Sequence, residues 1–282
     1  SVQINMKDID SQDMAPFKWS FIVGKKRQEV LPVFKYDGRL NSRLSTEQVS
    51  ETKLNIAEVN GDFSFDLQWA KLNTNLRFTS RESPYTQPHN RFGTQLLIGS
   101  FLNLRIGDFY PQFNQFTIDG KRVRGWGLKL DFKRLQFEFI NGELNRAVNE
   151  SGHINGGYQL IKDLITTNDD GSKTYFLDRT GFAFKRKIFG LKLNANLLSD
   201  IKMGFHFLKM RDDTSSVKHI LDKSLFSIDS SIPGIDPGNY TLDEFNNKLL
   251  NQGDKLNNPS TNWMGQKPLD NLLLGFNVGT AF

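Results

Sequence analysis

The stretch of the chain from residue 91 to residue 145 constrains the fold most, because apolar side chains recur there at every second position. Leu96, Ile98, Leu102 and Leu104 alternate with glycine and polar residues, and the alternation resumes from Trp126. A period of two is typical of strands with one face in an apolar medium. The stretch therefore predicts four strands in two hairpins, with tight turns at positions 99–100 and 133–134.

The same alternation recurs on both sides of this stretch. We expect further strands at positions 17–23, 34–44, 52–69, 72–79, 182–197, 201–207 and 272–282. A polar loop is expected at 45–50, and a bulge at 186–188 accounts for a change in the parity of the apolar residues. Within a long loop, Thr241 and Glu244 form a capping-box pattern that predicts a short helix over 245–250.

The order of the connections carries more information than any one strand. Tight turns are predicted at 70–71, 99–100, 133–134 and 199–200, and they alternate with polar loops at 81–90, 109–119, 146–174 and 211–268. Alternate connections of an up-and-down sheet lie at the same end, so one end of the sheet has short turns and the other end has the long loops. Outer-membrane barrels have this asymmetry. The predicted fold is all-β, an antiparallel up-and-down meander of about 10–12 strands forming a complete or incomplete transmembrane β-barrel.

Two regions are expected along the chain. Residues 1–31 form an N-terminal extension with one strand, and residues 32–282 form the barrel region with long loops at 146–174 and 211–268. The chain opens Ser-Val-Gln without a leader sequence, which we interpret as a mature chain or a fragment of a longer barrel.

Composition excludes several classes of protein. There is no cysteine, so neither a disulfide framework nor a thiolate metal site is available. The net charge of +5 is spread without a basic block, which argues against nucleic acid as a partner. No apolar run reaches the roughly 18 residues that a spanning helix needs.

Parity assigns each strand residue to one of two faces of the predicted barrel. The expected lipid-facing residues are Leu96, Ile98, Leu102, Leu104, Leu128, Leu130, Phe137, Phe139, Phe205 and Phe207. The expected polar residues of the lumen are Asp66, Arg77, Arg105, Lys129, Asp131, Glu138, Lys192 and His206. Opposite charges on neighbouring strands either brace the lumen or set its selectivity for solutes, and we keep both interpretations.

Signatures of catalysis and of metal binding are missing from the sequence. The four histidines have no ligand spacing, and no Gly-x-Ser-x-Gly motif occurs. The turn at 168–171 resembles a calcium loop, but that register puts Thr166 and Leu177 at ligand positions. We therefore expect no catalytic residues, no metal and no cofactor, and a protein that is not an enzyme.

A soluble all-β protein also alternates, with its apolar face inward. The alternative function is therefore a soluble ligand- or glycan-binding protein that uses the loops 146–174 and 211–268; a membrane-barrel enzyme is a third, less favoured hypothesis. Asn, Gln and Gly on the polar faces, and aromatic residues such as Trp69, Phe132 and Tyr110 near strand ends, favour the membrane barrel.

Four segments carry a resemblance to a family. They are Gly-Asp-Phe-Tyr-Pro at 107–111, Gly-Lys-Arg-Val-Arg-Gly at 120–125, Asn-Arg-Ala-Val at 145–148 and Lys-Met-Arg-Asp-Asp-Thr-Ser-Ser at 209–216. They resemble segments of large, mostly uncharacterised, porin-like outer-membrane β-barrel proteins of Gram-negative bacteria. The resemblance implies a bacterial outer-membrane location and a barrel architecture, and it carries no catalytic residues. For such a barrel with a polar lumen we expect a passive pore, transport or scaffold role. Expected partners are outer-membrane lipid, lipopolysaccharide near residues 120–125, and additional barrel segments or subunits.

Overall fold

The computed structural model describes ten parts of the chain: residues 2–4, 17–19, 34–49, 52–114, 118–153, 157–196, 201–221, 223–228, 232–257 and 267–280. The chain divides into two compact units, Ser1–Val33 and Phe34–Phe282. In the first unit, β1 (Val2–Ile4) pairs antiparallel with β2 (Phe17–Trp19). Residues 20–23 of the strand predicted there lie outside the described residues.

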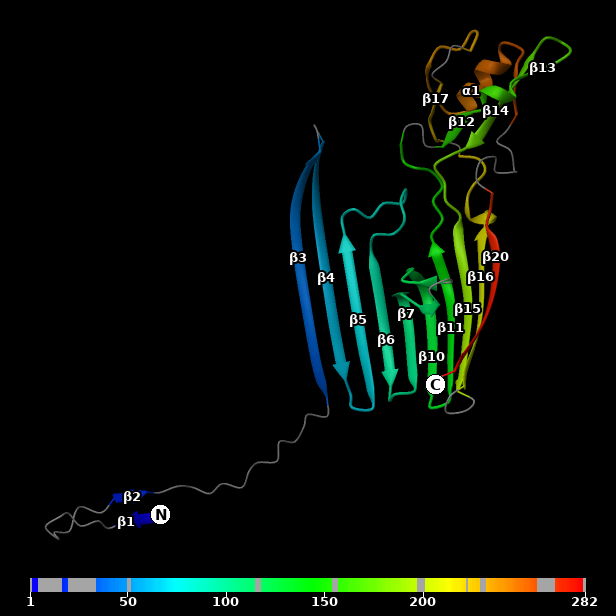
Figure 1. Cartoon of the computed structure of the whole chain (residues 1–282). Helices are drawn as coiled ribbons and strands as arrows, with labels where there is room; N and C mark the ends of the chain where they lie inside the picture. The colour runs from blue at the N-terminus through cyan, green and yellow to red at the C-terminus, as the bar shows by residue number, and fades with distance from the viewer. Residues whose placement is uncertain are drawn as a thin grey trace. The chain divides into compact units, whose positions relative to one another are not determined.

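The second unit is built on one ten-stranded antiparallel sheet in which each strand lies beside its neighbours in the chain (Figure 1). Its strands are β3 (Lys35–Val49), β4 (Thr52–Asp66), β5 (Ala70–Thr79), β6 (Arg91–Ile98), β7 (Leu102–Phe109), β10 (Val123–Phe132), β11 (Leu135–Asn145), β15 (Lys185–Asn196), β16 (Ile201–Asp213) and β20 (Asp270–Thr280). The all-β class and the antiparallel meander are confirmed. Among the described residues, β3 and β20 are the two edges of the sheet and do not pair with each other.

From β4 onward, tight turns gather at one end of the sheet and long connections at the other (Figure 1). The connection between β3 and β4 is the exception, because it spans only two residues and lies at the end with the long connections. The turns at 99–101 and 133–134 confirm two predictions, whereas the predicted turn at 199–200 lies outside the described residues. The turn predicted at 70–71 lies instead at 67–69, because Ala70 and Lys71 already pair with Ile98 and Leu97.

Two other local predictions are wrong. Residues 45–49 belong to β3, because the ladder with β4 continues to the pair Val49 and Thr52. The bulge lies in β11, between Glu143 and Asn145, instead of in β15. β15 itself pairs regularly with β16 from end to end.

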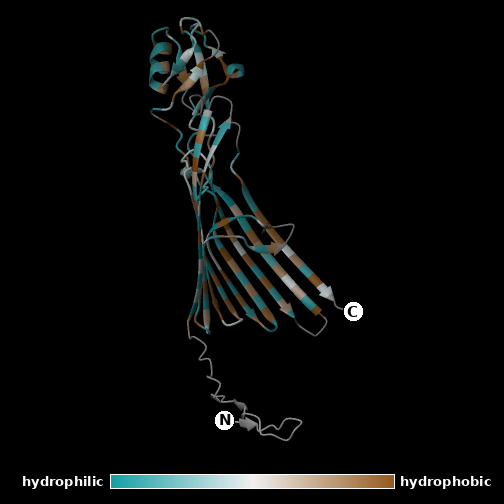
Figure 2. Cartoon of the chain, turned by 90° about the vertical axis from the view of Figure 1, so that its left-hand side faces the viewer, coloured by the Kyte–Doolittle hydropathy of each residue, from teal (hydrophilic) through white to brown (hydrophobic). Residues whose placement is uncertain are grey.

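The two faces of the sheet differ in chemistry, as the alternating colours of its strands show (Figure 2). On the outer face, one unbroken row of apolar side chains crosses all ten strands. The row is Tyr36, Phe65, Leu72, Leu96, Leu104, Leu128, Phe139, Leu191, Phe207 and Leu274. All ten predicted lipid-facing residues lie in this row or in the adjacent outer row toward the tight turns.

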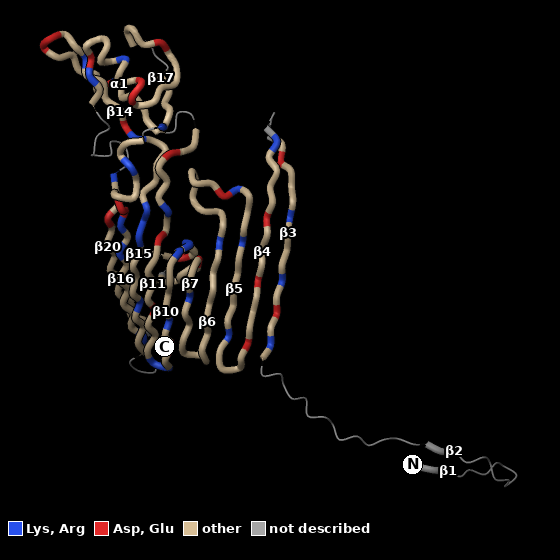
Figure 3. Tube along the Cα trace, turned by 180° about the vertical axis from the view of Figure 1, so that it is seen from behind, with Lys and Arg blue, Asp and Glu red and all other residues tan. Residues whose placement is uncertain are grey.

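Charged side chains border the apolar rows toward the long loops, where Figure 3 shows charges gathered near the ends of β15, β16 and β20. This charged row crosses six strands through Asp108, Arg124, Glu143, Lys187, Arg211 and Asp270. It lies two residues beyond Trp126 along β10. From Phe132 to Trp126 the outer face of β10 is apolar over roughly 20 Å of strand.

Glycine forms a row of its own on the inner face, which is the face opposite the apolar rows. Gly93, Gly107, Gly125 and Gly142 lie side by side on four adjacent strands. A Cβ atom at any of them would lie 2.2–2.5 Å from a backbone oxygen of a neighbouring strand. Such an approach requires a sheet that curves sharply toward the inner face, and glycine is the residue that permits it.

A small hairpin, β8 (Gln112–Asn114) with β9 (Ile118–Asp119), packs on the inner face. The Phe113 ring occupies the space beside Gly190, where a Cβ would lie 2.8 Å from it. Around this hairpin a buried cluster forms from Phe109, Phe113, Ile118, Val123, Ile140, Ile188 and Leu208. The inner face is therefore apolar beneath the hairpin and polar toward the tight turns.

The two longest connections fold together instead of remaining open loops. They contain β12 (Tyr158–Leu160), η1 (Lys162–Leu164), β13 (Thr166–Thr167), β14 (Lys173–Arg179), η2 (Thr214–Ser216), β17 (Phe226–Ile228), β18 (Gly238–Tyr240), α1 (Leu242–Leu250) and β19 (Lys255–Asn257). Phe226, Phe245 and Leu249 are at the centre of their own buried core. The predicted capping box of Thr241 and Glu244 is confirmed at the start of α1. No helix in the described ranges has both the length and the apolar character needed to cross a membrane.

A candidate solute site on the inner face

A polar pocket of about 350 Å³ lies on the inner face beside the β8–β9 hairpin. We call it the inner pocket. Its lining residues are Asn103, Arg105, Tyr110, Gln112, Lys129, Gln136, Glu138, Lys192 and Asn194. Strands β7, β10, β11 and β15 supply most of them, and the segment 110–112 supplies the rest.

Strand register explains why these residues meet. Lys129 pairs with Asn103 on one side and with Glu138 on the other, and Glu138 pairs with Lys192. Four polar residues that are far apart in the chain thus form one row across four strands. Since side chains at paired positions point to the same face of a sheet, the row faces the pocket as a unit.

Arg105 and Glu138 form the most enclosed ion pair of the pocket. Their side chains are 14% and 10% exposed, and the guanidinium Nη2 donates to the carboxylate Oε1. The guanidinium also lies 5.3 Å from the centre of the Phe109 ring. A buried charge is stable only with an opposite charge or hydrogen bonds beside it, so Arg105 and Glu138 hold each other in place in the lining of the pocket.

Lys192 attaches the hairpin to the sheet. Its Nζ donates to the carbonyl oxygens of Gln112 at 3.1 Å and Phe113 at 2.8 Å. Among the described residues no carboxylate oxygen lies within 4.0 Å of this ammonium group. Its contacts are therefore dipolar, and its positive charge is not neutralised by an ion pair.

The open side of the pocket carries a chain of polar contacts. Lys129 Nζ lies 3.8 Å from Asp131 Oδ2, and both side chains are 38% exposed. Gln136 donates to the same carboxylate at 2.8 Å and accepts from Asn194 at 3.4 Å. These contacts orient the amides but leave Lys129 partly exposed.

The eight predicted lumen residues do not all meet. Arg105, Lys129, Glu138 and Lys192 line the inner pocket, and Asp131 adjoins it through Gln136. The other three lie elsewhere on the inner face. Arg77 pairs with Glu58 at 3.1 Å, Asp66 accepts from the Gln68 amide at 2.9 Å, and buried His206 bonds to Asn277 at 2.9 Å. Whether any of them lines a solute path stays a prediction.

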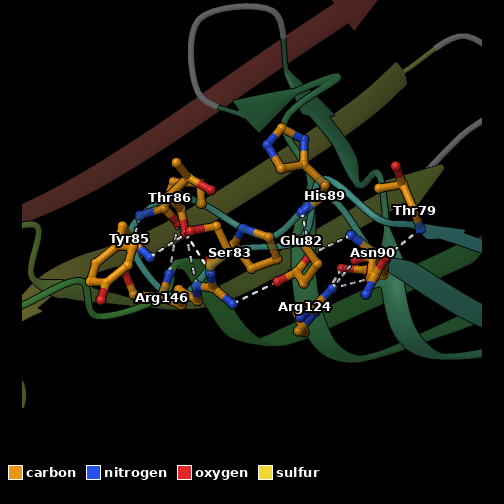
Figure 4. Close-up of polar contacts among 12 residues, drawn as sticks. Thr79, Glu82, Ser83, Tyr85, Thr86, His89, Asn90, Arg124 and Arg146 are labelled. Atoms are coloured by element: carbon orange, nitrogen blue, oxygen red, sulfur yellow. Dashed lines mark hydrogen bonds and ion pairs between the residues drawn. The ribbon is translucent and has the colours of Figure 1, made fainter. Parts of the chain in front are cut away.

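The loop between β5 and β6 is tied down by residues that sequence reasoning did not single out (Figure 4). The Glu82 carboxylate accepts from the amides of His89 and Asn90, each at 2.8 Å, and pairs with Arg146 at 2.8 Å. Arg146 also donates to carbonyl oxygens of Ser83 and Thr86. We call this set the loop clamp. It fixes the loop beside the end of β11.

A second set of contacts continues the loop clamp. Buried Asp108 accepts two bonds from Arg124, at 2.9 and 2.8 Å, and Arg124 reaches the Asn90 carbonyl at 2.7 Å. Arg122 donates to the Pro88 carbonyl at 2.9 Å. Two arginines of the segment 120–125 are therefore engaged within the protein, and Lys121 remains exposed there. The segments at 107–111, 120–125 and 145–148 were the signal for these contacts, because each contributes one of the paired charges.

The electrostatics of the loop clamp favour ionised Glu82. Burial acts to raise the pKa of Glu82, but the amides of Asn90 and His89 and the Arg146 guanidinium outweigh it, so this pKa lies below its ordinary value. The clamp is consequently formed by the ionised carboxylate of Glu82, and protonation of that group in acid weakens it.

Comparison with family models, with curated proteins and with solved structures finds no match for the chain. Within the described residues, no group of three side chains of the metal-binding types is positioned to hold a metal ion. The function is therefore inferred from the geometry of the site.

Proposed function

We propose that the ten-stranded sheet is the wall of an outer-membrane β-barrel of a Gram-negative bacterium, complete or part of a larger one. Its outer face contacts lipid, and its inner face lines a path for polar solutes. The role is passive passage or transport, without covalent chemistry. Its lipid contacts include lipopolysaccharide at the end with the long loops.

The observation that carries this proposal is the unbroken apolar row across all ten strands. The row belongs to the face without the hairpin, and large side chains on that face remain exposed, among them Tyr36 at 76%, Leu274 at 63% and Ile106 at 51%. A soluble protein rarely leaves so extended an apolar surface uncovered. Lipid is a medium in which such a surface is stable.

The charged row borders the apolar surface on six of the ten strands, whereas on β3 to β6 the outer face continues at that level with Leu40, Leu76 and Phe92. On β10, apolar side chains occupy roughly 20 Å of strand between the tight turn and the charged row, which compares with the roughly 25 Å apolar band of membrane barrels. Trp126 lies next to the border, as aromatic residues do at membrane interfaces. These features support a membrane position with the long loops outside the lipid.

The test is to place single spin labels on each face of the chain reconstituted in liposomes. Labels at Leu96 and Leu128 probe the outer face, and labels at the neighbouring positions Gln95 and Lys129 probe the inner face. We expect the first pair to be quenched by lipid-dissolved oxygen and the second pair by a water-soluble nickel complex.

The contrary result would be outer-face labels shielded from both quenchers, in a chain that stays soluble without detergent. The membrane proposal would then fail, and a soluble protein that binds a ligand through its folded long loops would replace it.

A further inference from the structure

The inner pocket has an excess of positive charge. Arg105, Lys129 and Lys192 line it against the single carboxylate of Glu138, which is an excess of two positive charges. Asp131, bonded to the lining residue Gln136, offsets one of them. The pair of Arg105 and Glu138 is internally balanced, so the one remaining positive charge belongs to Lys192 and Lys129, of which, within the described part of the chain, only Lys129 has a carboxylate partner, Asp131 at the long distance of 3.8 Å.

Three side chains around the inner pocket keep unused hydrogen-bond donors. Lys192 uses two of its three donors on backbone carbonyls, which leaves one. Asn103 accepts from Gln95 at 3.1 Å through its oxygen, so its NH₂ group is turned to other partners. Tyr110 accepts from Arg91 at 3.0 Å, which leaves its own hydroxyl hydrogen to donate. Donors that converge on one cavity favour a ligand rich in acceptor oxygens.

We propose that the inner pocket binds a small hydroxylated organic anion. A carboxylate or phosphate group of the ligand is held by Lys129 and Lys192, and its hydroxyl groups are held by the amides of Asn103, Gln136 and Asn194. The cavity volume of about 350 Å³ lies within the range of small-molecule sites. This inference rests on the proposed function, which supplies the route by which the anion arrives, and it names the solute class.

Lys129 is the residue on which to test this inference, because its side chain is 38% exposed and its recorded ion pair is long, at 3.8 Å. Its loss should therefore leave the sheet intact. Lys71 is a matched control. It lies on the same inner-face row, related to Lys129 through Leu97 and Asn103, and it does not line the inner pocket.

The experiment is calorimetric titration of the detergent-solubilised chain at low salt with gluconate, and with glucose as the uncharged counterpart. We expect gluconate to bind at least tenfold more tightly than glucose. Lys129→Gln should weaken gluconate binding about tenfold, because the neutral amide loses the charge-assisted bond to the carboxylate. Lys129→Arg, which keeps the charge, and Lys71→Gln should both bind gluconate within about twofold of the unmodified chain.

Equal affinity for gluconate and glucose, or unchanged gluconate binding by Lys129→Gln, would overturn the inference. Equal losses of gluconate affinity in Lys129→Gln and Lys71→Gln would overturn it as well, because they would indicate a general electrostatic attraction by the inner face instead of a specific site. The titration does not depend on lipid. Lipid-exposed outer labels without gluconate binding would therefore refute the inner pocket alone, and gluconate binding by a chain soluble without detergent would refute the membrane alone.

Discussion

At the scale of single residues, the glycine row decides how far the sheet can curve. Gly125 illustrates the constraint, since a Cβ there would lie 2.2 Å from the Asn141 oxygen and 2.5 Å from the Gly142 Cα. Both atoms belong to backbone that is held by the ladder between β10 and β11. A methyl group at this position has no side chain to displace, so the strands themselves must separate.

We predict that Gly125→Ala lowers the free energy of unfolding by about 3 kcal/mol, as expected for overpacking against a rigid neighbour. Urea titration of the detergent-solubilised chain measures the effect. Gly279→Ala is the control, because no atom lies within 4 Å of a Cβ at that inner-face position. Its cost should stay within about 0.5 kcal/mol. Equal stability of the two variants would show that the glycine row is not required for curvature.

Among the connecting elements, the loop between β5 and β6 is held in place by the loop clamp, whose contacts converge on the Glu82 carboxylate. The folded-state pKa of Glu82 is lowered, so ionised Glu82 stabilises the clamped loop at any pH above the ordinary carboxyl value. That contribution is lost as pH falls through the lowered pKa, which lies below the ordinary value of 4.5.

We therefore predict that the amides of His89 and Asn90 exchange slowly with solvent at pH 7 and faster, relative to the intrinsic rate, below about pH 4. Hydrogen exchange followed by mass spectrometry provides the measurement. Glu82→Gln should exchange fast in this loop at both pH values, while the neighbouring strands remain protected. A loop as protected at pH 3 as at pH 7 would contradict this role of Glu82.

The inner face shows what alternation can predict and where it fails. Parity placed Arg105, Lys129, Glu138 and Lys192 on one face because a strand has only two faces. It missed the hairpin core because Ile140, Ile188 and Leu208 lie on the polar face, each next to an apolar residue of the other parity. Such doublets, Phe139 with Ile140 and Phe207 with Leu208, were the visible signal. The contacts of the hairpin depend on a tertiary approach that no local pattern encodes.

At the scale of the whole molecule, the meander followed from the order of turns and loops, since short connections force neighbouring strands to pair. The shared core of the two longest connections could not be derived in this way. Tyr158, Tyr175, Phe226 and Phe245 come from segments distant in sequence, and their short apolar runs are too brief to predict a partner. The sequence also does not predict which strands the edge strands β3 and β20 pair with, because neither of them contains a pattern that identifies a partner strand.

If the outer face meets lipid, the cost of placing a charge on it depends on depth in the membrane. Leu128 lies in the row that crosses all ten strands, whereas Ile106 lies in the next row toward the charged border. In lipid, an arginine costs about 2–4 kcal/mol at mid-depth and less near an interface. Leu128→Arg should therefore lower the folding free energy in liposomes by about 3 kcal/mol, and Ile106→Arg by about 1 kcal/mol.

The inner face provides the control for depth. Gln95→Arg changes a side chain on β6 that lines a cavity of the polar face, and it should cost less than about 1 kcal/mol, because water in that cavity solvates the charge. The predicted order is Leu128→Arg, then Ile106→Arg, then Gln95→Arg, each measured by urea unfolding from vesicles. A soluble sheet would show no dependence on the row, since an exposed arginine is equally hydrated at every height. Equal costs at Leu128 and Ile106 would therefore argue that the apolar face meets protein or water instead of a bilayer.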